Sequence, residues 1–183
     1  TNSLIDWEFE PQKNDTYAIN QSLNIISLPE RFIGRRAELR RYKTDLLNGN
    51  IQKLLITGPG GQGKTALAGK LALDLQLHGK HVFAWSARPE YSWQGFRSYL
   101  AQALVGDYVK IYDRKYTSFA NELEHAEFLI DLLMQQFNGE VVFLFDNLES
   151  IQDPRRSHKV TDPLAKAWIG AACAFPKLTL LVT

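Results

Sequence analysis

The segment GPGGQGKT, residues 58 to 65, constrains the fold of this chain more than any other stretch of the sequence. It follows the apolar run LLIT and precedes ALAGKLALDL, a run of mostly good helix formers. The spacing Gly58-x-x-x-x-Gly63-Lys64-Thr65 is typical of a glycine-rich turn that joins a buried strand to a helix. A chain with this turn is therefore expected to contain a parallel sheet flanked by helices.

The same spacing predicts a phosphate-binding loop. Glycines let the backbone turn its N–H groups toward an anion, and the N-terminus of the following helix adds a partial positive charge. Lys64 is expected to contact the β- and γ-phosphate oxygens of a nucleoside triphosphate, and the Thr65 hydroxyl to bind Mg²⁺. The predicted nucleotide contacts in this segment are Gly58, Pro59, Gly60, Gly61, Gln62, Gly63, Lys64, Thr65 and Ala66. The alternative is a glycine-rich turn with a surface lysine.

Hydrophobic periodicity and turn residues predict strands and helices in alternation along the chain. The expected strands are residues 53–57, 81–87, 141–146 and 177–183. The expected helices are residues 36–47, 64–77, 92–104, 121–137 and 162–175, with a loop or broken helix at 106–117. The first strand is apolar enough to be buried on both faces. This alternation predicts a three-layer α/β/α P-loop NTPase fold with a mainly parallel sheet.

Two segments are expected along the chain. Residues 1–30 have no stable hydrophobic period and are interpreted as a linker or an arm lying on the domain. Residues 31–183 form the predicted nucleotide-binding domain. Because the last residues, KLTLLVT, resemble the middle of a strand, we expect the domain to be truncated at its C-terminal strand and to belong to a longer polypeptide.

The segment VVFLFDNLE, residues 141 to 149, predicts a metal-binding carboxylate. Five apolar residues lead to Asp146, as in a Walker B strand, so Asp146 is expected to hold Mg²⁺ with Thr65 from the end of a neighbouring strand. The alternative is an aspartate that only begins a turn. The amide of Asn147 is a poor base, so Glu149 is the local candidate to activate water, unless it is a solvated loop acid. Slow hydrolysis is expected.

Composition narrows the class of protein and its compartment. The formal net charge of +1 in 183 residues gives no indication of a nucleic-acid partner. Cys173 is the only cysteine, which excludes disulfides within the chain and favours a reducing compartment. No apolar stretch approaches the roughly 20 residues that span a bilayer, so a cytoplasmic protein without a membrane partner is expected. The base-reading motif Asn-Lys-x-Asp of guanine-specific GTPases is missing from the sequence, which favours ATP or ADP.

Residues 31–183 resemble the core of the STAND NTPases, the signal-transduction ATPases that include the NB-ARC and NACHT groups. The resemblance rests on the box RFIGRRAEL (residues 31–39), the phosphate loop, the strand VFAW, the segment FLFDNLE and the final LTLLVT. In bacterial members LDNLE is a common form of Walker B. The resemblance implies that Phe32, Ile33, Gly34 and Arg35 pack around adenine and ribose. The residues alone also allow Phe32 and Ile33 to be a hydrophobic staple before the helix.

The resemblance further implies a regulatory switch, in which ADP holds a closed resting state and exchange for ATP permits assembly. The catalytic candidates are Lys64, Asp146 and Glu149, from the phosphate loop and the segment VVFLFDNLE. The expected partners are copies of the chain itself and the sensor and effector domains of the same longer chain. The main competing interpretation is an AAA+ ATPase that acts on nucleic acid, because origin-recognition-like members carry a similar box. A small-molecule phosphotransferase shares the phosphate loop, and a binding module that keeps ATP without turnover would carry it too.

Overall fold

The computed structural model describes residue 26, residues 34–153 and residues 159–183. The helices in these parts are α2 (Arg36–Leu47), α3 (Lys64–Leu77), α4 (Trp93–Gln102), α5 (Asp107–Lys115), α6 (Glu122–Gln136), the 3-10 helix η1 (Leu148–Ile151) and α7 (Pro163–Ala174). The strands are β1 (Lys53–Leu55), β2 (His81–Ser86), β3 (Val141–Asp146), β4 (Gln152–Asp153), β5 (Lys159–Val160) and β6 (Thr179–Val182). The predicted arm, residues 1–30, lies outside the described residues except for the buried Ile26.

Four strands form a parallel sheet in the order β1-β6-β3-β2, and β4 and β5 form a separate antiparallel pair. The C-terminal strand β6 therefore lies between β1 and β3, with Leu180 paired to Lys53 on one side and to Phe143 on the other. Because the four strands are parallel, their carboxyl ends meet at one edge of the sheet. The prediction of an α/β fold with a mainly parallel sheet is confirmed.

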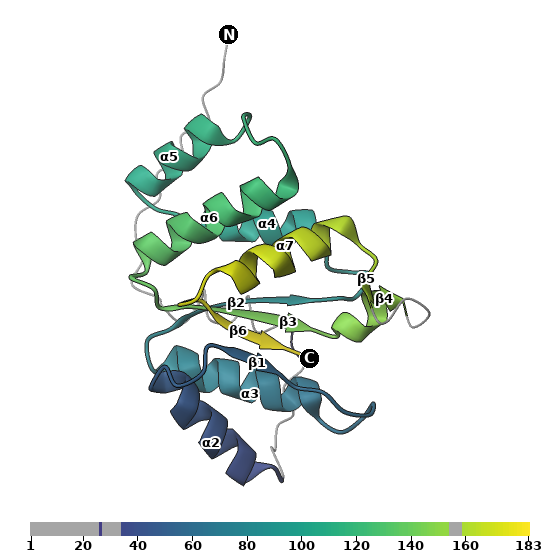
Figure 1. Ribbon diagram of the computed structural model, residues 1–183. Helices are drawn as coiled ribbons and strands as arrows, with labels where there is room; N and C mark the ends of the chain where they lie inside the picture. The colour runs from purple at the N-terminus through teal and green to yellow at the C-terminus, as the bar shows by residue number, and fades with distance from the viewer. Residues whose placement is uncertain (1–25, 27–33, 154–158) are drawn as a thin grey trace.

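Helices cover both faces of this sheet, which is compatible with an α/β/α arrangement (Figure 1). On one face α3 packs against the strands, and α2 packs against α3. On the other face lie α4, α6 and α7, with α5 packed on the outer side of α6. The sheet is therefore shielded from water on two sides and can be strongly apolar.

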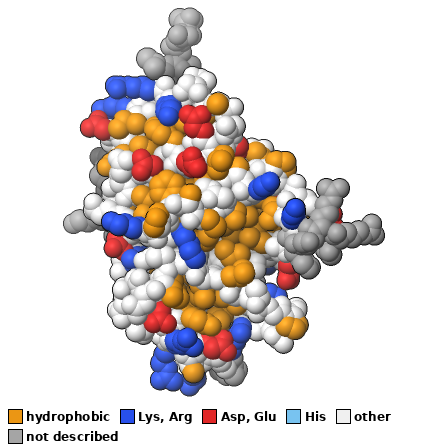
Figure 2. Space-filling view, viewed as in Figure 1, with side chains coloured by type: hydrophobic (Ala, Val, Ile, Leu, Met, Phe, Trp, Pro, Cys, Tyr) orange, Lys and Arg blue, Asp and Glu red, His pale blue; other side chains and the backbone are white. Residues whose placement is uncertain are grey.

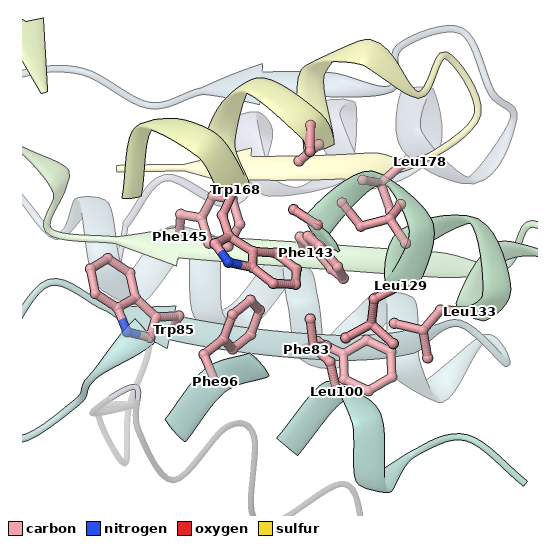
Figure 3. Close-up of a cluster of buried hydrophobic side chains, with 14 of the residues drawn as sticks. Phe83, Trp85, Phe96, Leu100, Leu129, Leu133, Phe143, Phe145, Trp168 and Leu178 are labelled. Carbon is pink, nitrogen blue, oxygen red and sulfur yellow. The ribbon is translucent and has the colours of Figure 1, made fainter. Parts of the chain in front are cut away.

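The alternation of side chains along β3 divides the core in two. Phe143 and Phe145 point into an aromatic core with Phe83, Phe96 and Trp168, shown in Figure 3. Val142 and Leu144 face the opposite side, where the core is aliphatic and formed largely with α3. All six residues of β3 are buried, as the most hydrophobic strand of the sequence predicts.

The predicted helix boundaries follow from capping side chains. Ser92 Oγ accepts a hydrogen bond of 3.0 Å from the Gly95 N–H at the start of α4. Asp162 Oδ1 accepts from the N–H groups at the start of α7, and Pro163 is the first helical residue. The helix after the glycine-rich loop extends from Lys64 to Leu77, as predicted.

The prediction for the first strand is wrong in extent and burial. β1 covers only Lys53–Leu55 and lies at the edge of the sheet, and the Leu55 side chain is 65% exposed. Among the described residues β1 pairs with β6 alone, so the layers that bury the central strands cover it less completely. The Lys53 ammonium donates hydrogen bonds of 2.6–3.0 Å to the carbonyl oxygens of Ala172, Phe175 and Leu178 and so ties this edge to the end of α7.

The interpretation of residues 106–117 as a loop or a broken helix is also wrong, because this segment contains the regular helix α5. Its one buried residue is Tyr112, whose hydroxyl lies 2.7 Å from Nε2 of His125 on α6. Five of its nine residues are charged, so the segment is polar overall although its apolar residues have helical spacing, which explains why the sequence did not predict a regular helix.

Charges of both signs are spread over the surface. Lys and Arg side chains gather at the end of the molecule where α2 lies, and α2 carries Arg36, Arg40, Arg41 and Lys43 (Figure 2). No helix in the described part of the chain is both long and apolar enough to cross a membrane.

Candidate functional site

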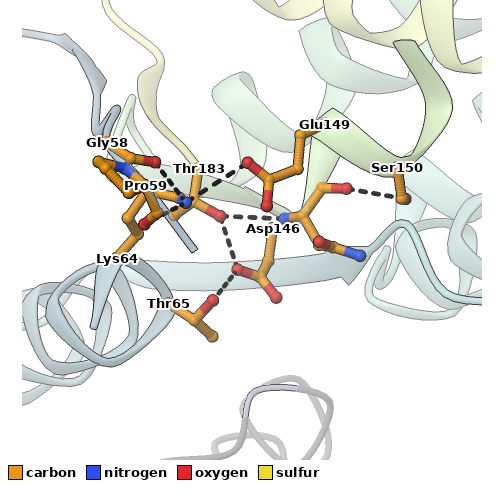
Figure 4. A network of polar contacts seen from close by, with 9 residues as sticks. Gly58, Pro59, Lys64, Thr65, Asp146, Glu149, Ser150 and Thr183 are labelled. Carbon is orange, nitrogen blue, oxygen red and sulfur yellow. Dashed lines mark hydrogen bonds and ion pairs between the residues drawn. The ribbon is translucent and has the colours of Figure 1, made fainter. Parts of the chain in front are cut away.

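The predicted site residues meet at the edge of the sheet where the parallel strands end. The loop 56–63 connects β1 to α3, the segment 147–151 follows β3, and Thr183 follows β6. Figure 4 shows that Lys64, Thr65, Asp146, Glu149 and Thr183 come together there in one network of polar contacts. The structure thus brings residues from both ends of the described chain into a single cluster.

The loop itself has a backbone that only glycine adopts easily at three positions. Gly58 has a φ of 145°, Gly61 has a φ of 76°, and Gly63, the N-cap of α3, has a φ of 74°. A Cβ atom on Gly58 would also lie 3.0 Å from Gln62 Oε1. The spacing of glycines in the sequence therefore reflects the conformation of the loop.

Backbone N–H groups of this loop have no acceptor among the described residues. In the parts of the chain that the structure describes, no hydrogen bond is donated by the N–H groups of Gly58, residues 60–63 or the first helical residues 64–66. The N–H groups in the first turn of a helix lack partners within the helix, and the helix dipole makes this end partly positive. The loop and the start of α3 therefore offer a row of donors suited to an anion.

Lys64 extends back across the loop. Its Nζ donates hydrogen bonds to the carbonyl oxygens of Gly58 at 2.8 Å and Pro59 at 3.3 Å, and it lies 3.4 Å from Glu149 Oε2. The Lys64 side chain is 10% exposed and that of Glu149 is 58% exposed. The ammonium is thus held beside the free N–H groups, with the Glu149 carboxylate reaching it from the solvent side.

Asp146 is the buried centre of the network. It ends β3 with no exposed surface, and its Oδ1 accepts hydrogen bonds of 2.7 Å from the hydroxyls of Thr65 and Thr183. Its Oδ2 accepts a hydrogen bond of 3.2 Å from the Ser86 hydroxyl. These donors compensate for burying a carboxylate, which would otherwise be costly.

The predicted pairing of Thr65 with Asp146 agrees with their contact, but the expected strand order does not. Asp146 was expected at the end of a strand neighbouring the one that enters the loop, whereas β6 lies between β1 and β3. Thr183, the residue after β6, fills the resulting gap: its N–H donates to Phe145 O and its hydroxyl to Asp146.

Asn147 has a structural role in the network. Its φ of 61° lies in the left-handed region, which asparagine tolerates better than most residues. Its Nδ2 donates to Ala87 O at 3.2 Å, and Ser150 Oγ donates to the same carbonyl at 2.7 Å. The segment after β3 is thereby fixed to the segment after β2.

The N-terminal box reaches the loop through Arg35. Arg35 has a φ of 49°, donates a hydrogen bond of 3.4 Å to Gln62 O and forms an ion pair of 2.9 Å with Glu38. Gly34, also predicted as a nucleotide contact, precedes it and is exposed. The predicted adenine contacts Phe32 and Ile33 lie outside the described residues.

The oxygens near Asp146 fit a magnesium ion better than a metal held by protein side chains alone. The described residues contain no group of three or more His, Cys, Asp or Glu side chains that could hold a metal ion. Magnesium is often bound through one or two carboxylates together with waters and substrate phosphates. Thr65 Oγ1 and Asp146 Oδ1 provide a hydroxyl and a carboxylate beside the free N–H groups of the loop.

Sequence reasoning missed the contacts that Ser86 and Thr183 make with Asp146. The strands HVFAWS, VVFLFD and TLLVT share one weak signal, an apolar run that ends in a polar residue. This signal gains meaning only when the three strands are known to be neighbours.

No family model matches the chain, and no curated protein matches it. The geometry of the loop, Lys64 and Asp146 is therefore the basis for a functional proposal.

Proposed function

We propose that this chain is the nucleotide-binding core of a P-loop NTPase of the STAND type, which binds ATP or ADP with Mg²⁺ and acts as a slow regulatory switch. The observation that carries the proposal is the 2.7 Å contact between Thr65 and Asp146 at the base of a loop whose N–H groups have no described acceptors. A hydroxyl, a buried carboxylate, a lysine and an array of N–H donors form the combination that phosphoryl-transfer sites require.

Each residue has a role in this proposal. The N–H groups of residues 60–66 cradle the β-phosphate, and Lys64 contacts the β- and γ-phosphate oxygens after leaving the loop carbonyls. Thr65 and Asp146 hold Mg²⁺, which when bound neutralises phosphate charge. Glu149 orients or deprotonates the attacking water. The proposal assigns contacts with adenine and ribose to Phe32, Ile33, Gly34 and Arg35, of which Arg35 donates a hydrogen bond to the loop.

The proposed activity is regulatory. A γ-phosphate adds contacts at Lys64 that ADP lacks, so the two nucleotides stabilise different arrangements of the loop and of the segments bound to it. In a longer cytoplasmic chain, ADP would then hold a closed state, and ATP would permit self-assembly through flanking domains. The RFIGRRAEL box and the FLFDNLE segment support the STAND type.

Nucleotide content and affinity test the proposal. The purified chain is denatured and any released nucleotide is identified, and the binding of ADP and ATP with MgCl₂ is measured by titration calorimetry. Lys64→Ala is expected to weaken binding at least tenfold, since a hydrogen bond to a charged group contributes about 1.5–3 kcal/mol. Lys70→Ala is the matched control, because Lys70 lies on the same helix and pairs with Asp74.

The outcomes separate the candidate functions. Bound ADP that Lys64→Ala lacks, with slow turnover, supports the switch. Rapid turnover that is stimulated by nucleic acid would instead support an AAA+ ATPase. Rapid transfer of phosphate to a small acceptor would support a phosphotransferase. A wild-type chain that binds neither nucleotide would overturn the proposal.

A further inference from the structure

Three neighbouring strands end in a row of buried polar residues. Ser86 and Asp146 are partners in the register of β2 and β3, and Thr183 follows β6 on the other side of β3. Ser86 and Asp146 have no exposed surface, and Thr183 is 7% exposed. Polar residues at such depth need hydrogen-bond partners, and these three provide them for one another.

The hydrogen bonds distinguish the two oxygens of Asp146. Oδ1 faces the loop and accepts from Thr65 and Thr183, whereas Oδ2 accepts from Ser86. A metal ion that binds Thr65 takes a lone pair of its oxygen, so the O–H group can still donate to Oδ1 of Asp146. Oδ1 therefore has two side-chain donors, whereas Ser86 is the one side-chain donor to Oδ2 among the described residues.

We propose that Ser86 is a positioning residue for the metal site, holding Oδ2 of Asp146 so that Oδ1 faces Thr65 and thereby setting the affinity for Mg²⁺. This inference rests on the proposed nucleotide function. Residues that hydrogen-bond a metal ligand and fix its orientation typically change metal affinity by 10–100-fold when they are replaced. Ser86 touches neither the loop nor Lys64 through any hydrogen bond, so its effect is confined to the dependence on metal.

If Ser86 had only a structural role, a different result would be expected. Removing a buried hydroxyl would lower the stability of the fold and leave the dependence on Mg²⁺ unchanged. The matched control is Thr179→Ala, because Thr179 is 2% exposed and donates to Gln52 Oε1 at the opposite end of the sheet. Loss of stability without a change in metal dependence is expected for this control.

The test measures the binding of a fluorescent ADP analogue while MgCl₂ is varied, with EDTA as the metal-free reference. For Ser86→Ala we expect the Mg²⁺ concentration that gives half of the metal-dependent gain in affinity to rise at least about tenfold, with the affinity in EDTA unchanged. Ser86→Cys nearly preserves the size of the side chain but donates a weaker hydrogen bond, so its half-maximal Mg²⁺ concentration should also rise. If the alanine variant fails to fold, the cysteine variant provides the test.

The outcomes for Ser86 and for the proposed function are distinct. A wild-type chain that binds the analogue, together with serine variants whose Mg²⁺ dependence stays within about twofold of wild type, overturns the role of Ser86 alone. Wild-type binding that is independent of Mg²⁺ overturns it as well. A wild-type chain that binds no nucleotide overturns the proposed function, and the inference falls with it.

Discussion

Asn147 and Glu149, which follow Asp146 in the sequence, have different roles. Asn147 adopts a left-handed backbone and anchors its amide to Ala87 O, so this position serves the geometry of the turn. Glu149 is more than half exposed and lies 3.4 Å from the Lys64 ammonium. Of the two, only Glu149 has a carboxylate directed at the predicted phosphate site.

Replacing Glu149 tests its proposed role as a base. We expect Glu149→Gln to lower the rate of ATP hydrolysis by about 100-fold or more, because a positioned general base contributes 10²–10⁴-fold. ADP binding should persist. Steady-state phosphate release and calorimetry measure the two quantities, and Glu127→Gln, on the exposed face of α6, is the control. An unchanged hydrolysis rate would make Glu149 a solvated loop acid.

The glycine-rich loop and Asp146 could be predicted from the sequence because their chemistry depends on local spacing. Ser86 and Thr183 could not, since their contact with Asp146 depends on strand order. β6 enters the sheet between β1 and β3 although it comes last in the chain. No local pattern in a single sequence encodes that insertion.

At the scale of elements, α5 docks on α6 through Tyr112 and His125, and also through Lys115, whose Nζ lies 3.6 Å from Glu124 Oε1. Tyr112 is 6% exposed and His125 is 5% exposed, and the ring of Phe119 stacks on His125 with centroids 4.3 Å apart. Burial raises the pKa of Tyr112 to about 12. Together with the Lys115 contact, the bond between Tyr112 and His125 fastens α5 to α6.

The stability of this docking is expected to depend on pH. Burial, aided by the Arg97 charge and opposed by Glu122, lowers the pKa of His125 below its ordinary value of 6.5. The unfolded chain then binds a proton more readily than the folded chain, so the free energy of unfolding decreases as pH falls below that value. In the neutral tautomer with its proton on Nδ1, Nε2 accepts the Tyr112 hydrogen bond, and protonation removes this acceptor.

Urea denaturation at pH 7.5 and pH 5.5 measures this effect. The wild-type chain should lose more unfolding free energy between the two pH values than His125→Gln, which does not titrate and can still bond Tyr112. Equal losses in the two proteins would show that folding does not lower the pKa of His125.

The whole molecule depends on two unlike cores on either side of one sheet. The aromatic core surrounds Phe143 and Phe145, and the aliphatic core surrounds Val142 and Leu144. The strong hydrophobic run of β3 and the amphipathic pattern of α6 made this layering predictable. The exposure of the short edge strand β1 was not predictable from its apolar sequence, because it depends on which elements lie beside the strand.

Truncating the aromatic core should destabilise the whole domain. Phe143→Ala is expected to cost about 3–5 kcal/mol, because Phe143 is fully buried and its removal leaves a cavity between the sheet and the helices. This is a large part of the 5–15 kcal/mol typical of a domain. Guanidinium denaturation measures the loss, and Leu123→Ala, at a position that is 42% exposed, is the control. Similar costs for the two variants would contradict the assignment of Phe143 to the core.

The pairing of β1 with β6 also has a consequence for the order of events during synthesis and folding. β1 leaves the ribosome early, yet its described partner in the sheet is made from residues 179–182. Contacts between distant segments require closure of a long loop and form slowly. The glycine-rich loop, which directly follows β1, therefore gains its final position only after the last strand has been translated. Until then the nascent chain is expected to bind no nucleotide at this loop.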